Sequence, residues 1–70
     1  MLVFENATIV GRSMGENNIV VVMDENTGNT VKLTNPNGLE LETGFEGTVE
    51  FDALSAQLIS FVPMMQEELV

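Results

Sequence analysis

Short runs of β-forming residues, separated by clusters of Asn, Gly and Pro, cover most of this chain. Seven Asn and six Gly supply turn positions. No segment before the last few residues carries a 3.6-residue hydrophobic period long enough to predict a helix. Five or six short strands joined mainly by tight turns are typical of a small antiparallel β fold. We therefore predict an all-β chain that folds as a small barrel or a curled sheet.

The length of the chain limits it to one domain, because a single small core needs most of its 70 residues. The sequence has no Cys and no His, which excludes disulfides, thiolate metal sites and imidazole chemistry. We predict a single β domain over residues 1–63 and an amphipathic tail over residues 64–70. Pro63 ends the last strand, and the tail is long enough for one helical turn at most.

The alternation of apolar and polar residues predicts where the strands lie. The predicted strands are residues 2–10, 19–23, 30–34, 45–52 and 58–62. Leu39 and Leu41 form a short strand or an extended link whose side chains reach the core. In the first strand the alternation breaks at Glu5 and Asn6, which predicts a β-bulge near Asn6. Such a bend is typical of a strand that curls around a small barrel.

Two turns have a clear chemical signature. Residues 24–29 predict a hairpin loop in which Gly28 takes the left-handed conformation of a type I turn plus bulge. Residues 35–38 predict a second turn, with Gly38 at a position that needs a positive φ. The strand between these turns faces the core with Val31 and Leu33. Residues 11–18 are a polar connection.

The last strand leaves two orientations open, with either Ile59 and Phe61 or Leu58 and Val62 facing inward. The strand before it alternates cleanly, which predicts a half-buried strand whose inner face consists of residues 45, 47, 49 and 51. All four phenylalanines fall on predicted inward faces, and we expect them to be core residues: Phe4, Phe45, Phe51 and Phe61.

A bulged first strand, a central hairpin and the Gly-led stretch at residues 44–51 together resemble OB-type barrels and the small single-stranded-DNA-binding barrels of filamentous phages. The resemblance covers most of the chain and implies an OB-like barrel, with an SH3-like barrel as the other arrangement of such strands. It also implies single-stranded-DNA binding as one candidate function. That function depends on basic grooves and exposed aromatic side chains.

The charge balance argues against nucleic acid as a partner. Eleven acidic residues stand against Arg12 and Lys32, which gives a formal net charge of −9. Two cations could neutralise about two phosphates at most. Membrane-surface binding needs basic segments for the same reason. No apolar run approaches the length of a membrane span, and no basic region precedes Leu2 as in a signal peptide. We expect a cytoplasmic protein whose partner is a basic protein surface or a second copy of itself.

Enzymatic activity is not expected. Ser13, Ser55 and Ser60 have no His or paired Lys to act as a base. The loop at residues 24–29 fails the EF-hand pattern, because Gly28 stands at the fifth position and Asn29 at the place of the invariant Gly. A chain of this size also lacks room for a cleft that encloses a small-molecule substrate. We therefore predict no catalytic residues, no metal site and no cofactor.

A row of carboxylates is the candidate binding site. Glu46, Glu50 and Asp52 project from one face of the same predicted strand, along which residues two apart lie about 7 Å from each other. Glu40 and Glu42 lie close by in sequence. Such a row is either a solvated outer face or a surface that presents regularly spaced negative charges, as a phosphate backbone does, to a basic protein.

The apolar strand at residues 19–23 is the candidate for self-association. A strand with one solvated face should alternate, so apolar residues at every position indicate that both faces are covered. Either the tail or a second subunit covers the outer face. The predicted interface of a homodimer consists of Val20, Val22, Met64, Met65 and Leu69.

The sequence thus favours a small acidic protein-interaction module. Its expected role is that of an inhibitor, from a virus or a mobile element, that presents a carboxylate face to a basic nucleic-acid-binding protein. One alternative is a structural protein that assembles into a homo-oligomer through its apolar strand. A second alternative is the single-stranded-DNA-binding protein that the OB resemblance implies.

Overall fold

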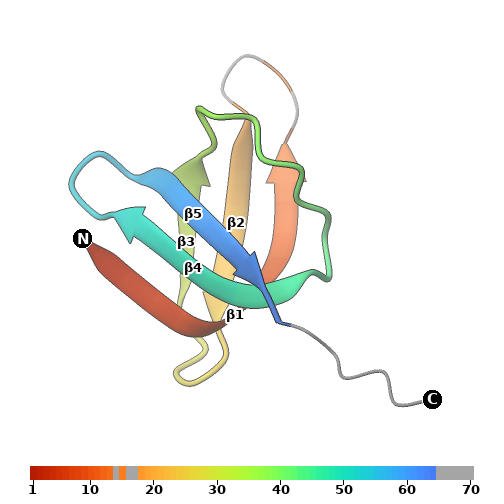
Figure 1. Ribbon diagram of the computed structural model, residues 1–70, viewed down its shortest axis with the longest axis vertical. Helices are drawn as coiled ribbons and strands as arrows, with labels where there is room; N and C mark the ends of the chain where they lie inside the picture. Colours follow the sequence, from red (N-terminus) through yellow and green to blue (C-terminus); the bar gives the residue numbers. More distant parts are fainter. Residues whose placement is uncertain (14, 16–17, 65–70) are drawn as a thin grey trace.

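The computed structural model describes residues 1–13, 15 and 18–64, and this part of the chain contains five strands and no helix (Figure 1). The strands are β1 (Leu2–Ser13), β2 (Ile19–Asp24), β3 (Thr30–Thr34), β4 (Glu46–Asp52) and β5 (Gln57–Pro63). The prediction of an all-β fold is confirmed. Within the same residues, no helix has the length and apolarity needed to cross a bilayer. Residues 65–70 of the predicted tail lie outside the described residues.

The five strands close into a barrel in the order β1-β2-β3-β5-β4, with β4 back against β1. Neighbouring strands are antiparallel except β3 and β5, which are parallel and joined at the pair Thr34 and Gln57. A simple meander would place β4 beside β3, but here β5 lies between them. This crossover is the Greek-key connection of an OB-type barrel. The small-barrel prediction is therefore confirmed, with OB-like strand order.

β1 is longer than predicted, because Gly11, Arg12 and Ser13 continue to pair with β2. The expectation of a connection that begins at Gly11 is wrong. β1 pairs with β4 through its first half and with β2 through its second half (Figure 1). Its register shifts against β4 between Phe4 and Ala7, which confirms the predicted bulge near Asn6. A second shift, against β2, lies between Ile9 and Gly11. The two irregularities let one strand curl around the barrel.

The core consists of nine buried apolar side chains from all five strands and from the loop before β4. They are Ala7, Ile9, Val20, Val22, Leu33, Leu41, Val49, Phe51 and Leu58. Leu39 and Val31 pack against this cluster. The segment around Leu39 and Leu41 is therefore the predicted extended link, and it reaches the core without forming a strand.

Phe45 corrects the expectation that all four phenylalanines are core residues. It precedes β4, its side chain is 42% exposed, and its ring stacks on that of Phe61 at a centroid distance of 6.4 Å. The reason is a long-range backbone contact, because the Phe45 carbonyl accepts a hydrogen bond from the amide of Ile9 in β1. Phe51 is buried, and Phe4 packs edge-on against it at 4.9 Å.

β5 follows neither of the two predicted orientations. Leu58 is buried and Phe61 packs against the core, whereas Ile59 and Val62 are exposed. The register against β4 shifts so that Glu50 pairs with Ser60 and Phe51 pairs with Leu58. Ile59 is the extra residue of a bulge, and it breaks the two-residue period on which both predictions depended.

The turn predictions are confirmed by the backbone. Gly28 has φ of 81° and Gly38 has φ of 66°, both in the left-handed region that favours glycine. In the hairpin loop, the Gly28 amide donates to the Asp24 carbonyl at 2.7 Å.

Candidate protein-binding surface

The outer face of β4 carries three of the predicted carboxylates. Glu46, Glu50 and Asp52 alternate with Gly47, Val49 and Phe51, whose side of the strand is buried. The side chains of alternate residues in a strand point to opposite faces, so the three carboxylates share the face that points away from the core. This part of the sequence prediction describes the geometry of β4 correctly.

Two of these carboxylates also hold the sheet together. Glu50 accepts a hydrogen bond from the Ser60 hydroxyl of β5 at 3.3 Å. Asp52 accepts one from the Leu54 amide at 3.0 Å and so caps the turn between β4 and β5. The Leu54 amide, and next the Ser55 hydroxyl, lower the pKa of Asp52 below its ordinary value of 3.8. Asp52 therefore stays negatively charged throughout the neutral range.

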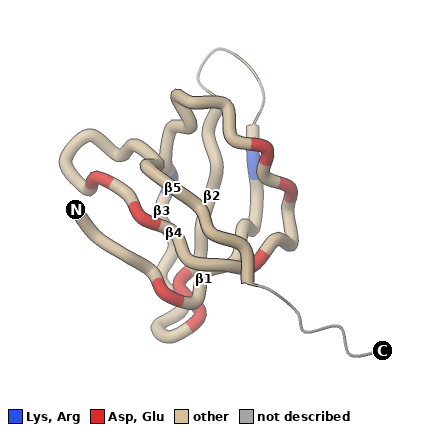
Figure 2. The backbone as a smooth tube through the Cα atoms, in the orientation of Figure 1, with Lys and Arg blue, Asp and Glu red and all other residues tan. Residues whose placement is uncertain are grey.

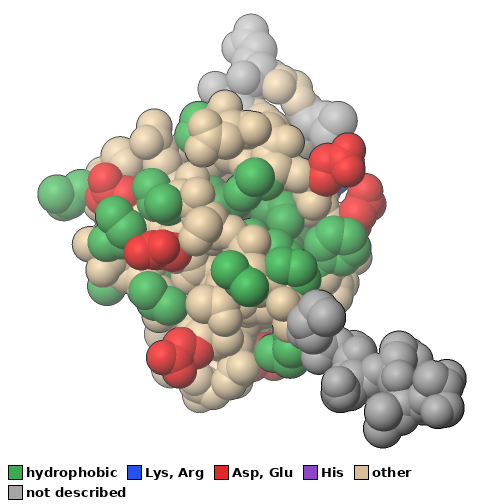
Figure 3. Space-filling model, in the orientation of Figure 1, with side chains coloured by type: hydrophobic (Ala, Val, Ile, Leu, Met, Phe, Trp, Pro, Cys, Tyr) green, Lys and Arg blue, Asp and Glu red, His purple; other side chains and the backbone are tan. Residues whose placement is uncertain are grey.

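Apolar side chains surround this row of carboxylates, and the sequence pattern did not reveal them as a group. Val3 pairs with Glu50 across β1 and β4 and is 50% exposed, and Val62 on β5 is 59% exposed. Ile59, at the β5 bulge, is 39% exposed. Figure 3 views the barrel from the side of β4 and β5, where apolar side chains lie among carboxylates. We call the set Val3, Glu46, Glu50, Asp52, Ile59 and Val62 the acidic–apolar surface.

Glu40 and Glu42 do not belong to this surface. Both lie on the loop before β4, which runs along the side of the barrel opposite the end of β4 (Figure 2). Glu42 approaches Arg12 of β1 to 3.7 Å, and Arg12 also donates to the carbonyl of Leu41. Closeness in sequence suggested one row of five carboxylates. The turn at residues 43–44 instead divides the row into two groups.

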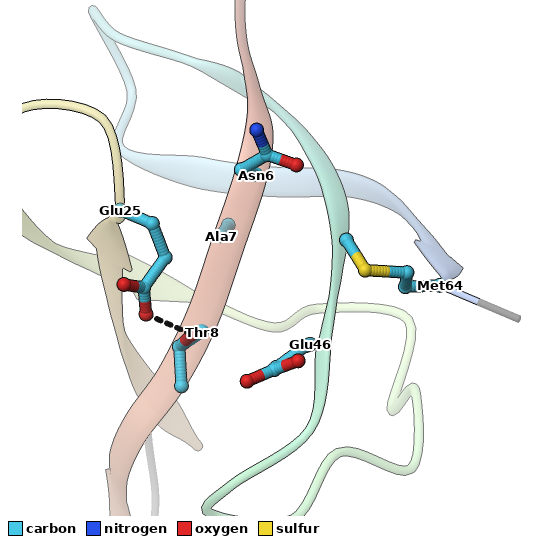
Figure 4. Close-up of a pocket in the computed structure, with 6 residues that line it drawn as sticks. All are labelled: Asn6, Ala7, Thr8, Glu25, Glu46 and Met64. Carbon is cyan, nitrogen blue, oxygen red and sulfur yellow. Dashed lines mark hydrogen bonds between the residues drawn. The ribbon is translucent and has the colours of Figure 1, made fainter. Parts of the chain in front are cut away.

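A pocket of about 250 Å³ lies at the start of β4 (Figure 4). Its lining residues are Asn6, Ala7, Thr8, Glu25, Glu46 and Met64. Glu25 comes from the hairpin loop and is held by a hydrogen bond from the Thr8 hydroxyl. β1 brings the two glutamates together, because Thr8 pairs with Met23 on one side and with Glu46 on the other. The sequence did not predict that Glu25 and Glu46 lie close together, because their proximity depends on the register of β1, β2 and β4.

The predicted homodimer interface needs correction at β2. The side chains of Val20 and Val22 are 1% and 0% exposed inside the barrel, so they cannot contact a second copy while the barrel is closed. Val21 and Met23 occupy the outer face of β2 and are partly buried there. Met64 is 45% exposed at the end of β5, and Met65 and Leu69 lie outside the described residues.

No Lys or Arg belongs to the acidic–apolar surface, and the positive charge of the N-terminus also lowers the pKa of Asp52, after the hydrogen bonds from Leu54 and Ser55. Within the described part of the chain, no Lys or Arg forms an ion pair with Glu46, Glu50 or Asp52. Lys32 is exposed on β3, where it pairs with Val21 of β2.

Among residues 1–13, 15 and 18–64, no three acidic side chains gather closely enough to hold a metal ion.

Comparisons of the chain with protein-family models, with curated proteins and with solved structures gave no match. Conclusions about function therefore rest on the chemistry of the surface.

Proposed function

We propose that this protein is a protein-interaction module that binds a basic surface of another protein through the acidic–apolar surface, and that it competes there with nucleic acid. The observation that carries the proposal is the outer face of β4, where three carboxylates that form no ion pair with a Lys or Arg of the described residues lie among exposed valine and isoleucine side chains. No catalytic chemistry is part of this role.

The charge supports a basic partner. A net charge of −9 on a chain of this size repels polyanions and attracts cations over a distance set by the ionic strength. Complementary charge mainly raises the association rate and selects the partner. Lys or Arg side chains that normally contact phosphates would find three carboxylates along the outer face of β4, about 7 Å apart between Glu50 and Asp52 and about 14 Å apart between Glu46 and Glu50. Nucleic-acid-binding proteins are the class of partner that presents several Lys and Arg side chains in a row.

The apolar side chains support a protein rather than a simple counter-ion as the partner. Val3, Ile59 and Val62 offer contact area that an inorganic cation or a polyamine would not use. Protein interfaces combine an apolar centre with a polar rim, and a few well-packed side chains supply most of the affinity. The combination of apolar side chains and carboxylates on β4 and β5 matches this composition.

The test measures association rates of the chain with a panel of purified basic nucleic-acid-binding proteins, at several NaCl concentrations. For a binding member of the panel, the triple variant E46Q/E50Q/D52N should associate about tenfold more slowly and with a weaker salt dependence. Gln and Asn keep the hydrogen-bond acceptors of Glu50 and Asp52, so the fold should be retained.

A matched pair of double variants controls for net charge. E50Q/D52N and E40Q/E42Q remove the same number of charges, but only the first lies on the acidic–apolar surface. The proposal expects the first to slow association and the second to leave it near the wild-type rate. Equal effects of the two variants would show that only the overall charge matters, and no binding to any basic protein would reject the proposal.

A further inference from the structure

The turn between β4 and β5 carries the most exposed large apolar side chain of the described residues. This side chain, Leu54, is 98% exposed, and the turn projects from the barrel (Figure 1). Leu54 follows Asp52, the last residue of β4, by two positions, so their Cα atoms lie at most about 7 Å apart. An exposed leucine is therefore the neighbour of a carboxylate of the acidic–apolar surface.

The turn is held in place by hydrogen bonds at both of its ends. The Leu54 amide donates to Oδ1 of Asp52 at 3.0 Å. The Ala56 carbonyl accepts from the amide of Thr34 at 2.8 Å and from its hydroxyl at 3.3 Å. These contacts join the turn to β4 and to β3. A side chain on a preorganised turn gives up less conformational freedom when it binds, which favours affinity.

The sequence of the turn does not follow the rules for an exposed connection. Residues 53–56 contain no Gly, Pro, Asn or Asp, the residues that favour tight turns through their backbone or side-chain chemistry. Ala56 has φ of 56°, in the left-handed region where a residue with a Cβ is strained. Departures from local rules gather at functional sites. The turn therefore has the features of a binding element.

The neighbouring leucine and carboxylate correspond to the two parts of a nucleotide. Proteins that bind single strands combine cations that contact the phosphates with aromatic platforms on which the bases stack. Proteins that bind a duplex meet bases that are still stacked on one another, and they contact the base edges from the grooves. An apolar side chain beside a carboxylate therefore suits a single-strand-binding surface better than a duplex-binding one.

We propose that Leu54 is an anchor that covers a base-stacking platform of a single-strand-binding protein, while Asp52 and Glu50 contact the cations beside that platform. This inference rests on the proposed function and narrows it to one class of partner. The carboxylates raise the association rate, and the buried leucine slows dissociation. A single well-packed apolar side chain supplies a large share of the affinity of many interfaces.

Isothermal titration calorimetry of the chain with purified basic proteins tests the proposal. One group binds single strands on aromatic platforms, and the other binds duplex DNA. The wild type should bind a member of the first group more tightly than any member of the second. Leu54→Ala should weaken this binding at least about tenfold and leave its salt dependence unchanged, because it removes apolar area and no charge. The variant keeps the Leu54 amide that caps Asp52, so the fold should be retained.

Val10→Ala is the matched control. Val10 is an apolar side chain that is 40% exposed, and it lies in β1 beyond the pair Thr8 and Glu46, at the end of β4 opposite to Asp52. Binding that L54A weakens and V10A does not supports the proposal. If E50Q/D52N weakens binding but L54A binds as the wild type does, the anchor is rejected and the proposed function stands. Tighter binding to a duplex-binding protein also rejects the anchor. Absence of binding to every basic protein rejects both.

Discussion

Asn35 is a buried polar side chain that organises the turn after β3. It is 4% exposed, its Nδ2 donates to the Leu39 carbonyl at 2.8 Å, and its Oδ1 accepts from the Leu39 amide at 3.1 Å. The turn in this way directs the following segment, including Leu41, onto the core.

Asn35→Ala should lower the free energy of unfolding by about 1–3 kcal/mol, because it leaves both backbone groups of Leu39 without this partner. Urea denaturation measures the change. Asn35→Asp puts a buried carboxylate oxygen against the Leu39 carbonyl, so a loss at least as large is expected near neutral pH. A change of less than about 0.5 kcal/mol in Asn35→Ala would show that water replaces the side chain.

Asp52 predicts a specific pH dependence. The Leu54 amide and the Ser55 hydroxyl lower its pKa in the folded state below 3.8, so its charged form stabilises the fold. This contribution is fully present above the unfolded-state pKa and is lost as the pH falls through the folded-state pKa. The stability difference between wild type and Asp52→Asn should therefore be positive near neutral pH and vanish in acid. Urea unfolding at several pH values checks this, and a pH-independent difference would contradict it.

At the residue scale, local chemistry was predictable and long-range packing was not. The positive φ angles of Gly28 and Gly38 follow from the short-range rules of turns. The exposure of Phe45 depends on the pairing of its carbonyl with β1, far away in sequence. The burial of Asn35 likewise depends on a loop that must first fold back onto the barrel.

At the scale of elements, Gly47 sets how closely β5 crosses β4. A Cβ at this position would lie 2.3 Å from the Val62 carbonyl oxygen and 2.9 Å from the Phe61 ring. Because one of these neighbours is backbone, β5 would have to move.

Gly47→Ala should cost about 1–3 kcal/mol or more of unfolding free energy, a large part of the stability of a small domain. Gly11→Ala is the control, since its Cβ would meet Val21 at an ordinary 3.9 Å. Thermal unfolding should show a clear loss for the first variant and little change for the second. If the two variants unfold at the same temperature, the close approach of β5 does not limit stability.

Strand positions were predictable where one face alternates and less so where a bulge intervenes. The bounds of β3 match the prediction, and those of β2 and β4 match to within a residue at one end. The bulge near Asn6 was visible because it interrupts a regular pattern. The bulge at Ile59 was hidden, because the residues around it are apolar on both faces and allow either register.

At the scale of the whole molecule, a net charge of −9 opposes the compact state through self-repulsion. The melting temperature should therefore rise between about 10 mM and 500 mM NaCl as the charges are screened. A gain of about 1 kcal/mol corresponds to roughly 4–8 °C in a domain of this size. The variant E46Q/E50Q/D52N should show a smaller rise. A melting temperature independent of NaCl in the wild type would contradict this expectation.

The barrel itself was predictable from the number of strands, their spacing and the curl of β1. The order of the strands was not, because the pairing of β3 with β5 has no local signature. The separation of Glu40 and Glu42 from the carboxylates of β4 could not be predicted either, because it too depends on long-range strand pairing. Glu42 and Glu46 are close in sequence, but the barrel directs one toward Arg12 and the other toward Glu25.

We propose that the chain occupies the nucleic-acid site of a basic protein. The most direct measurement is the fluorescence anisotropy of a labelled oligonucleotide bound to such a protein, while the chain is titrated in at low salt. We expect the anisotropy to fall to the value of the free oligonucleotide, and E50Q/D52N to be a weaker competitor than E40Q/E42Q. An anisotropy that stays constant for every basic protein, or that rises because the chain itself binds the oligonucleotide, would contradict this proposal.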